Sequence, residues 1–222
     1  MEAPFLYPSM SNKITKITQQ KKLRERFNIF IDGKFELGID GSLILKYDIK
    51  VGDEYTPELK HDLENDDRVE MAYTGLLNFI AFRERCEYEV HQWLYKKQFI
   101  DLEDDLVERL KDRNYLNDER FARLFIKDRV KIKGWGPIRL RHELNQKRIA
   151  KHIIEAEIES IREDCSFDEL AGDQAIRKLK HVAKPTYKDK KRLWSFLQRR
   201  GFEPSSINSA LSHFTFVPDS DA

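Results

Sequence analysis

Apolar residues recur along this chain in three copies of one pattern. Each copy starts at an alanine, and apolar residues follow it 4, 18, 22 and 27 positions later. The three copies read Ala72, Leu76, Val90, Leu94 and Phe99; Ala122, Ile126, Leu140, Leu144 and Ile149; and Ala175, Leu179, Leu193, Leu197 and Phe202. The copies are offset by 50 and then 53 residues, and the alignment needs no gap. Such a repeat predicts stacked helical units that share a continuous core.

Helical periodicity and capping signals extend from Thr56 almost to the end of the chain. Thr56-Pro57 is a typical helix start, and Gly136-Pro137 places a proline in another first turn. Gly201 is typical of a position just beyond a helix C-terminus. The predicted helices span 57–65, 68–82, 86–97 and 101–113; 118–131, 136–147 and 150–163; and 167–182, 187–200 and 204–213.

A shorter segment rich in β-forming residues precedes the helices. Two alternating runs flank the turn signal Asp32-Gly33-Lys34, and a second turn signal follows at Asp40-Gly41. The expected strands cover 14–18, 27–31, 35–39 and 42–47. Because a lone hairpin is barely stable, this small antiparallel meander must pack on the helices or on a partner.

The patterns together predict a mainly α protein. It consists of three tandem three-helix repeats, elongated and curved, with a small N-terminal β-hairpin or meander. The expected parts are a disordered tail at 1–12, the β-hairpin region at 13–56, helical repeats at 57–113, 114–164 and 165–214, and a frayed tail at 215–222.

Charge is unevenly distributed along the 222 residues, although the formal net charge is only +1. Residues 51–108 hold 16 Asp/Glu against 6 Lys/Arg, a local balance of −10. Residues 109–151 have 14 Lys/Arg and 5 acids, and residues 176–201 have 10 Lys/Arg and one acid, so each balance is +9. A single charged run is typical of a solvated helix face. Two basic blocks in corresponding repeats favour instead a polyanionic or acidic protein partner.

Composition and motifs also bear on compartment and chemistry. Cys86 and Cys165 are far apart and form no CxxC pair, which fits a reducing cytoplasm. The chain has no 18-residue apolar run and no apolar signal segment, so we expect a cytoplasmic protein without a membrane span. The six histidines have no metal-ligand spacing, and neither a phosphate-binding loop nor a nucleophile motif occurs. The acidic cluster 103–105 is interpreted as one exposed helix face, so we expect no metal, cofactor or catalytic site.

The second copy of the repeat carries the densest motif. It reads YLNDERFA at 115–122, followed by the Gly136-Pro137 turn and a LxxEL helix that ends near Ile149. This stretch resembles the RecX family of bacterial regulators of the RecA recombinase. The segment RFNIFIDGKFELGI at 26–39 is similar to the hairpin of longer family members, and the resemblance covers roughly residues 13 to 213. The matching positions, interpreted as mainly structural, are Tyr115, Leu116, Asp118, Glu119, Phe121, Ala122, Gly136, Pro137, Leu140, Glu143, Leu144 and Ile149.

One departure from the family motif concerns backbone conformation. Arg148 replaces a glycine that follows the LxxEL helix, where a left-handed residue is expected. A non-glycine residue has a steric cost at such a position.

The resemblance implies a protein that binds RecA, as monomer or filament, and mostly inhibits its recombinase activity. It would thereby regulate DNA repair, homologous recombination and the SOS response, and would act as a monomer by occupancy, without catalysis. Single-stranded DNA within the filament is an implied partner. Groove binding, capping of filament ends and stripping of monomers all stay open.

Basic side chains of repeats two and three are the candidates for contact with the filament or its DNA. They are Arg123, Lys127, Arg129, Lys131, Lys133, Arg139, Arg141, Lys147, Arg148, Lys188, Lys190, Lys191, Arg192, Arg199 and Arg200. Each taken alone is equally typical of a solubilising surface residue. The acidic first repeat is the candidate contact for a basic patch on RecA.

Other interpretations of these residues are left open. Trp93 and Trp194 border the repeat core, whereas Trp135 in its glycine-flanked turn is a candidate for base stacking. Asp118 and Glu119 are expected to cap a helix and to interact with its dipole. The alternative functions are a sequence-independent DNA- or RNA-binding module that acts without RecA, and a nucleic-acid-processing enzyme. The enzyme would require a metal-binding carboxylate set, and none is evident in the sequence.

Overall fold

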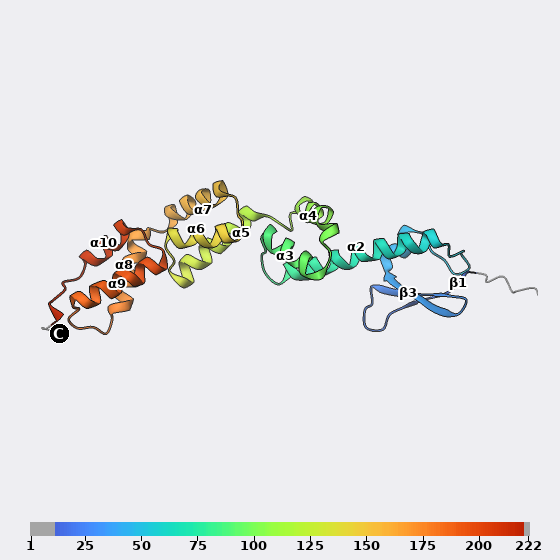
Figure 1. The fold of residues 1–222 in the computed structure, drawn as a ribbon, viewed down its shortest axis with the longest axis horizontal. Coiled ribbons are helices and arrows are strands. Elements are labelled where there is room, and N and C mark those ends of the chain that lie inside the picture. The colour runs from blue at the N-terminus through green and yellow to red at the C-terminus, as the bar shows by residue number, and fades with distance from the viewer. Residues whose placement is uncertain (1–11, 220–222) are drawn as a thin grey trace, which may run out of the picture. The chain divides into compact units, whose positions relative to one another are not determined.

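The computed structural model describes residues 12–219, so the expected tail at 1–12 lies, except for Asn12, outside the described part (Figure 1). The chain forms two compact units, one ending at Phe82 and the other beginning at Arg83. The first unit is a small sheet with two helices, and the second is helical. The predicted mainly α fold with an N-terminal sheet is confirmed.

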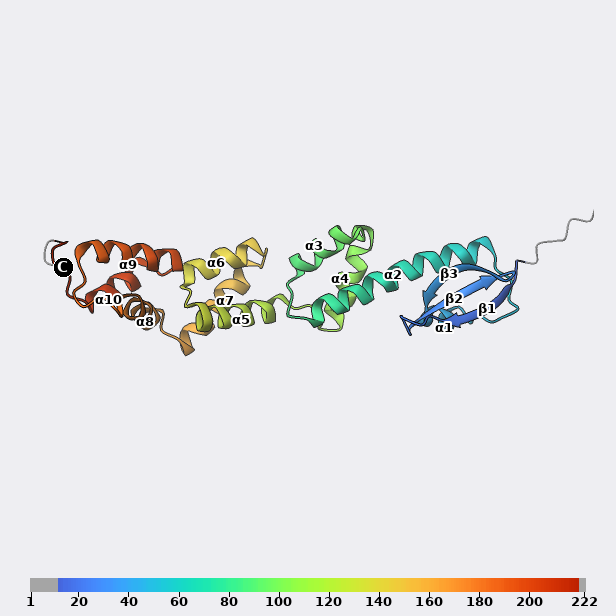
Figure 2. The ribbon, with the colours of Figure 1, turned by 90° about the horizontal axis from the view of Figure 1, so that it is seen from below.

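The first unit contains a three-stranded antiparallel sheet in the order β1-β2-β3. Strand β1 is Ile14–Gln19, β2 is Arg26–Ile31 and β3 is Lys34–Asp40, followed by α1 (Gly41–Lys46) and α2 (Pro57–Ala81). Figure 2 shows the three strands side by side beside α2. Their buried face forms a core with α1, α2 and the loop between these helices, which includes Ile14, Ile29, Ile31, Ile39, Leu43, Ile49, Tyr55 and Leu63.

The strand predicted at 42–47 is wrong, because this segment forms helix α1. The carboxylate of Asp40 accepts hydrogen bonds from the backbone N–H of Ser42 at 2.9 Å and from its hydroxyl at 2.6 Å. This side-chain cap satisfies a donor that would otherwise be free at the start of a helix. Leu43 is then buried in the core, while Leu45 is 84% exposed. The packing of this short helix on the sheet therefore decides which of its leucines is buried.

The break predicted between helices at 57–65 and 68–82 is also wrong, because α2 is continuous. The polar residues at the expected break are held by the sheet and by α1. Asp66 accepts hydrogen bonds from Lys46 at 2.6 Å and Tyr47 at 2.7 Å. Asp67 is only 8% exposed and accepts two hydrogen bonds from the Arg26 guanidinium. Tertiary pairing therefore compensates the weak helix propensity of aspartate.

The second unit consists of α-helices with two irregular turns. Its elements are α3 (Glu87–Lys97), a 3₁₀ turn (Ile100–Leu102), α4 (Glu103–Asp112), α5 (Asp118–Asp128), a π turn (Arg129–Lys133), α6 (Pro137–Gln146), α7 (Lys151–Asp164), α8 (Phe167–Leu179), α9 (Tyr187–Arg200) and α10 (Pro204–Ser212). We refer to α5–α7 as repeat two and to α8–α10 as repeat three. The helices predicted for both repeats are present, with ends that differ by a few residues.

The repeat pattern of the sequence is visible in the structure as equivalent helix ends. A residue with positive φ lies just beyond each of α3, α6 and α9. Gln98 (φ 62) and Gly201 (φ 85) directly follow their helices, whereas Arg148 (φ 57) is the second residue after α6. In each case the next residue donates a hydrogen bond back into the helix, from Phe99 to Leu94 at 2.9 Å, Ile149 to Leu144 at 3.2 Å and Phe202 to Leu197 at 3.3 Å. Arg148 therefore adopts the left-handed conformation despite its side chain.

The C-terminal segment is not frayed over the part that is described. Val217 forms a parallel bridge with Thr186, and its N–H donates to the carbonyl of Pro185 at 3.0 Å. The carboxylate of Asp219 accepts a hydrogen bond from the N–H of Lys188 at 2.9 Å. These contacts place residues 217–219 against the start of α9.

Candidate nucleic-acid interface between repeats two and three

Repeats two and three meet where the start of α6 reaches the end of α9. The N–H of Gly136 donates to the carbonyl of Arg200 at 2.8 Å, and that of Ile138 donates to Gly201 at 2.9 Å. Free donors of one helix thus pair with free acceptors of the other. A Cβ at Gly136 would lie 2.4 Å from the Gly201 oxygen, and one at Gly201 would lie 2.3 Å from the Arg139 nitrogen. Two glycines therefore permit this direct backbone contact.

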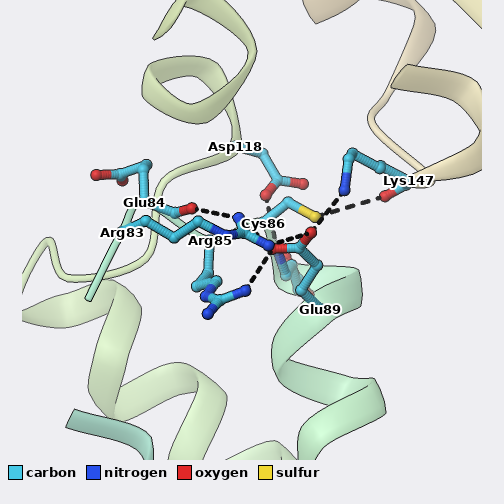
Figure 3. A network of polar contacts seen from close by, with 8 residues as sticks. Arg83, Glu84, Arg85, Cys86, Glu89, Asp118 and Lys147 are labelled. Carbon is cyan, nitrogen blue, oxygen red and sulfur yellow. Dashed lines mark hydrogen bonds and ion pairs between the residues drawn. The ribbon is translucent and has the colours of Figure 1, made fainter. Parts of the chain in front are cut away.

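The start of α3 meets repeat two in an equivalent way, through side chains (Figure 3). Asp118 accepts a hydrogen bond from the N–H of Glu87 at 2.8 Å, so it caps α3 rather than its own helix. The carboxylate of Glu89 forms ion pairs with Arg83 at 2.9 Å and with Lys147 at 2.5 Å. The thiol of Cys86 lies 3.9 Å from the carbonyl oxygen of Lys147, and burial raises its pKa to about 11.

The remaining motif residues are structural in this fold. Asn117 caps α5 by accepting a hydrogen bond from the N–H of Arg120 at 2.8 Å, and Glu119 is exposed in the first turn. Glu143 pairs with Arg139 at 3.5 Å, while the ring of Tyr115 is half-exposed. The buried motif residues are Leu116, Phe121, Ala122, Gly136, Pro137, Leu140, Leu144 and Ile149.

A basic groove of about 940 Å³ lies between repeats two and three. Eight Lys/Arg side chains line it against one acid, Asp164. They are Lys127, Lys131, Lys133, Arg139, Arg177, Lys178, Arg199 and Arg200. Lys127 lies on α5, and Lys131 and Lys133 lie in the π turn. Arg139 lies on α6, and the other four lie near the ends of α8 and α9. The groove is therefore built by elements of both repeats.

Most of these cations are available to a ligand. Six are exposed and form no ion pair with another described residue: Lys127, Lys131, Lys133, Arg177, Lys178 and Arg199. Arg200 donates to the carbonyl of Lys133, and its pKa lies below the usual range because burial and the nearby Arg139 disfavour its charge. The groove therefore concentrates positive charge that a bound anion would neutralise.

Two aromatic side chains lie among the cations of the groove. The guanidinium of Arg139 lies 4.1 Å from the ring centroid of Trp135, and that of Arg129 lies 5.4 Å from it. Phe196 contacts Arg200, whose guanidinium lies 4.8 Å from its ring centroid, and Lys178 at 5.5 Å. Such cation–π contacts orient guanidinium groups without neutralising their charge.

Several predicted contact residues lie outside this groove in ion pairs. Arg123 forms a two-point contact with the buried Glu157, at 2.9 and 3.1 Å. Arg141 pairs with Glu155 at 3.0 Å, Lys147 with Glu89 at 2.5 Å and Arg129 with Asp128 at 2.5 Å. Arg148 instead lies over the ring of Tyr88, 4.7 Å from its centroid. Arg123 and Arg141 thus connect helices of repeat two, and Lys147 connects repeat two to α3, whereas Arg129 pairs with its neighbour in sequence.

The predicted cluster at the start of α9 also lies outside the groove. Its members are Lys188, Lys190, Lys191 and Arg192. Arg192 pairs with Asp189 at 3.5 Å, and the amine of Lys190 lies 5.6 Å from the ring centroid of Phe216.

Two residues that the sequence analysis did not single out, Arg177 and Lys178, complete the groove. They belong to the basic block at 176–201 and lie in the last turn of α8. Their position opposite Lys127 and Lys131 depends on how α8 packs, so only the block's net charge pointed to them.

Among residues 12–219, no group of three or more His, Cys, Asp or Glu is arranged to hold a metal ion. None of the described helices is long and apolar enough to cross a membrane.

Comparison with known proteins gives consistent matches. The family models for the "Regulatory protein RecX N-terminal domain", the second RecX three-helix domain and the third RecX three-helix domain match residues 12–56, 117–157 and 167–211. The chain is 34% identical over 218 residues to "Regulatory protein RecX" of Bacillus velezensis, which covers 94% of this chain and 80% of that protein. It is 34% identical over 217 residues to the protein of that name from Bacillus subtilis, covering 94% and 79%.

Solved structures show the same fold. A crystal structure of regulatory protein RecX aligns with a TM-score of 0.69 at 21% identity, covering 88% of this chain and 97% of that chain. RecX from Lactobacillus salivarius aligns with a TM-score of 0.59 at 19% identity, covering 67% and 97%.

Proposed function

Because this chain belongs to the RecX family of regulatory proteins, we propose that it regulates RecA by binding the RecA–DNA filament through the groove between repeats two and three. Occupation of the filament inhibits recombinase activity, and so regulates DNA repair, homologous recombination and the SOS response. The protein acts through binding and performs no chemistry of its own.

The excess of eight cations over one acid around this groove carries the proposal. Phosphate groups are recognised by Lys and Arg without any need to read base edges. Six of the groove cations have no ion pair with a described residue, so they can bind phosphates without breaking an existing contact. Arg139 and Arg200, fixed by their contacts with Trp135 and Phe196, supply oriented guanidinium groups beside them.

A second contact is proposed for the acidic part of the chain. Asp104, Asp105 and Glu108 are exposed on α4, opposite the buried Leu106 and Leu110 of the same helix. Their carboxylates suit a basic patch on RecA, as opposite charges across an interface favour association.

Fluorescence anisotropy of the labelled chain at near-physiological salt tests the groove. Titrations with single-stranded DNA, with RecA, and with RecA–ATP filaments on that DNA are expected to show tightest binding to the filament. Lys127→Glu combined with Arg177→Glu should weaken this binding at least tenfold. The control Lys190→Glu with Lys191→Glu makes the same change in net charge outside the groove, and should have a smaller effect.

Two outcomes would contradict the proposal. Equal weakening by the two pairs of substitutions would show that only net charge matters and that the groove is no specific site. Equally tight binding to bare single-stranded DNA, with no gain from RecA, would assign the chain to the sequence-independent nucleic-acid modules instead.

A further inference from the structure

The sheet of the first unit has one buried and one open face. Ile29, Ile31 and Ile39 lie in the core, with α1 and α2 on their side. The other face of the sheet carries a different set of residues, which the strand register pairs across neighbouring strands. Phe30 pairs with Lys16 and with Phe35, and Asn28 pairs with Thr18 and with Gly38. Phe30 and Phe35 do not belong to the hydrophobic core of the unit. The open face therefore carries an aromatic pair beside polar residues.

The two phenylalanines form an accessible aromatic surface. Their rings meet edge to face with centroids 6.0 Å apart, and Phe35 is 59% exposed. The amine of Lys16 lies 5.7 Å from the centroid of the Phe30 ring. The exposed ring of Phe35, next to a second ring that has a cation over it, suits a ligand that combines a flat apolar group with an anion.

The charge around this face favours such an anion. Residues 13–35 contain seven Lys/Arg and two Asp/Glu. Five of these cations are exposed and form no ion pair with another described residue: Lys13, Lys16, Lys21, Lys22 and Arg24. Arg26, in contrast, is paired with Asp67 of α2. Lys16 of β1 and the three cations of the β1–β2 loop therefore form no ion pair with a described residue.

Amide groups complete the open face. The side chain of Gln20 donates to that of Asn28 at 2.8 Å. Both lie close over Gly38, since a Cβ at this position would be 2.7 Å from the Gln20 nitrogen and 3.4 Å from the Asn28 oxygen. Amide side chains of this kind offer both donors and acceptors to polar ring edges.

We propose that the open face of the N-terminal sheet binds single-stranded nucleic acid. Bases stack on Phe35 and Phe30, and phosphates bind Lys16 and the cations of the β1–β2 loop. Stacking requires bases freed from a duplex, so single strands are the preferred form. This site lies on a different unit from the inter-repeat groove and goes beyond the function proposed above.

Binding of fluorescein-labelled oligothymidylate to the intact chain tests the site. To isolate it, every variant is made in a background that carries Lys127→Glu and Arg177→Glu. Phe35→Ala should weaken binding about five- to tenfold, the lower part of the range seen when a stacking side chain is removed. Lys16→Ala should lower the slope of log affinity against log salt by about 0.7. The control Leu45→Ala removes an 84% exposed side chain from α1 and should leave binding unchanged.

Two further measurements separate stacking from general attraction or misfolding. Phe35→Trp should retain the affinity, and its added indole fluorescence should be quenched by the oligonucleotide. Photocrosslinking with 5-iododeoxyuridine should label peptides within residues 26–40. Unchanged affinity of Phe35→Ala would overturn the proposal and leave a surface suited to any polyanion, including an acidic protein. Crosslinks confined to the groove residues would also overturn it, without affecting the groove itself.

Discussion

The backbone N–H of Gly136 donates a 2.8 Å hydrogen bond to the carbonyl of Arg200, 64 positions further along the chain. This contact brings the start of α6 against the end of α9 and fixes one wall of the basic groove relative to the other. The groove therefore depends on the close approach of two backbones, with Gly136 on one side and Gly201 on the other.

Alanine at either glycine should destabilise this unit. Gly136→Ala would place a Cβ 2.4 Å from the Gly201 oxygen, and a forced shift of this kind costs about 1–3 kcal/mol. Gly172→Ala is the matched control, because its Cβ would meet nothing within 4 Å and a helical alanine gains about 1 kcal/mol over glycine. Urea unfolding followed by circular dichroism measures both. Equal midpoints for Gly136→Ala and the wild type would refute the close contact.

The backbone conformation of Arg148 gives a second prediction. At φ 57 a glycine is favoured over other residues by about 1 kcal/mol. Arg148→Gly should therefore be more stable than Arg148→Ala by about this amount, since both lose the contact with Tyr88. At Gln146, the last residue of α6, the order should reverse. Greater stability of Arg148→Ala than of Arg148→Gly would exclude a left-handed Arg148.

The pairing of Asp67 should matter more than that of its neighbour Asp66. Loss of Asp67 leaves the largely buried Arg26 guanidinium without its partner, which costs about 3–5 kcal/mol. Asp66 pairs with Lys46, which is 60% exposed, so its loss should cost about 1 kcal/mol or less. Thermal unfolding of Asp67→Ala and Asp66→Ala measures the difference, and similar melting points would contradict it.

Acid should weaken the junction between α3 and repeat two through Glu89. Burial alone would raise the pKa of Glu89, but the hydrogen bonds from Arg83 and Lys147 outweigh it and lower the pKa below the usual range. The ion pairs therefore contribute stability above the unfolded-state pKa of about 4.3, and this contribution is lost as the pH falls through the lower folded value. Glu89→Gln should show a shallower loss of unfolding free energy between about pH 5 and pH 3. A slope equal to that of the wild type would show that Glu89 does not titrate with unfolding.

The salt dependence of filament binding should show how many groove cations contact phosphates. Each cation that contacts a single-stranded phosphate contributes about 0.7 to the slope of log affinity against log salt. Lys131→Ala should therefore reduce the slope for filament binding by about that amount, whereas Arg123→Ala should leave it unchanged, because Arg123 is held by Glu157. Anisotropy titrations at several salt concentrations provide the slopes. A reduced slope for Arg123→Ala would place its guanidinium on the ligand instead.

The sequence predicted the parts of the fold that depend on local pattern. The apolar columns through Ala122, Leu140 and Leu144 are buried, and the turns at Gly136 and Gly201 lie where expected. Errors arose where tertiary contacts overrule local preference. Asp40 starts a helix where alternation favoured a strand, and Asp67 continues α2 because Arg26 reaches it.

The candidate site was predictable as a charge balance but not as a set of residues. Arg123 and Lys127 are four positions apart on α5, yet Arg123 pairs with Glu157 and Lys127 lines the groove. The packing of α7 and α8 decides which cation is neutralised. A single sequence does not contain that information in any local spacing.

The junctions at Gly136 and at Cys86 arrange α9, α6 and α3 head to tail, the C-terminus of each meeting the N-terminus of the next. Their peptide dipoles therefore add in one direction along the second unit. The positive end of this row of dipoles is the N-terminus of α9, beside Lys188. The negative end is the C-terminus of α3, and the acidic α4 follows it in the chain. Within the second unit, the direction of these three aligned dipoles matches the change from the basic start of α9 to the acidic first turn of α4. The field of a polyanion would therefore favour an approach in which the start of α9 is the leading end of the second unit.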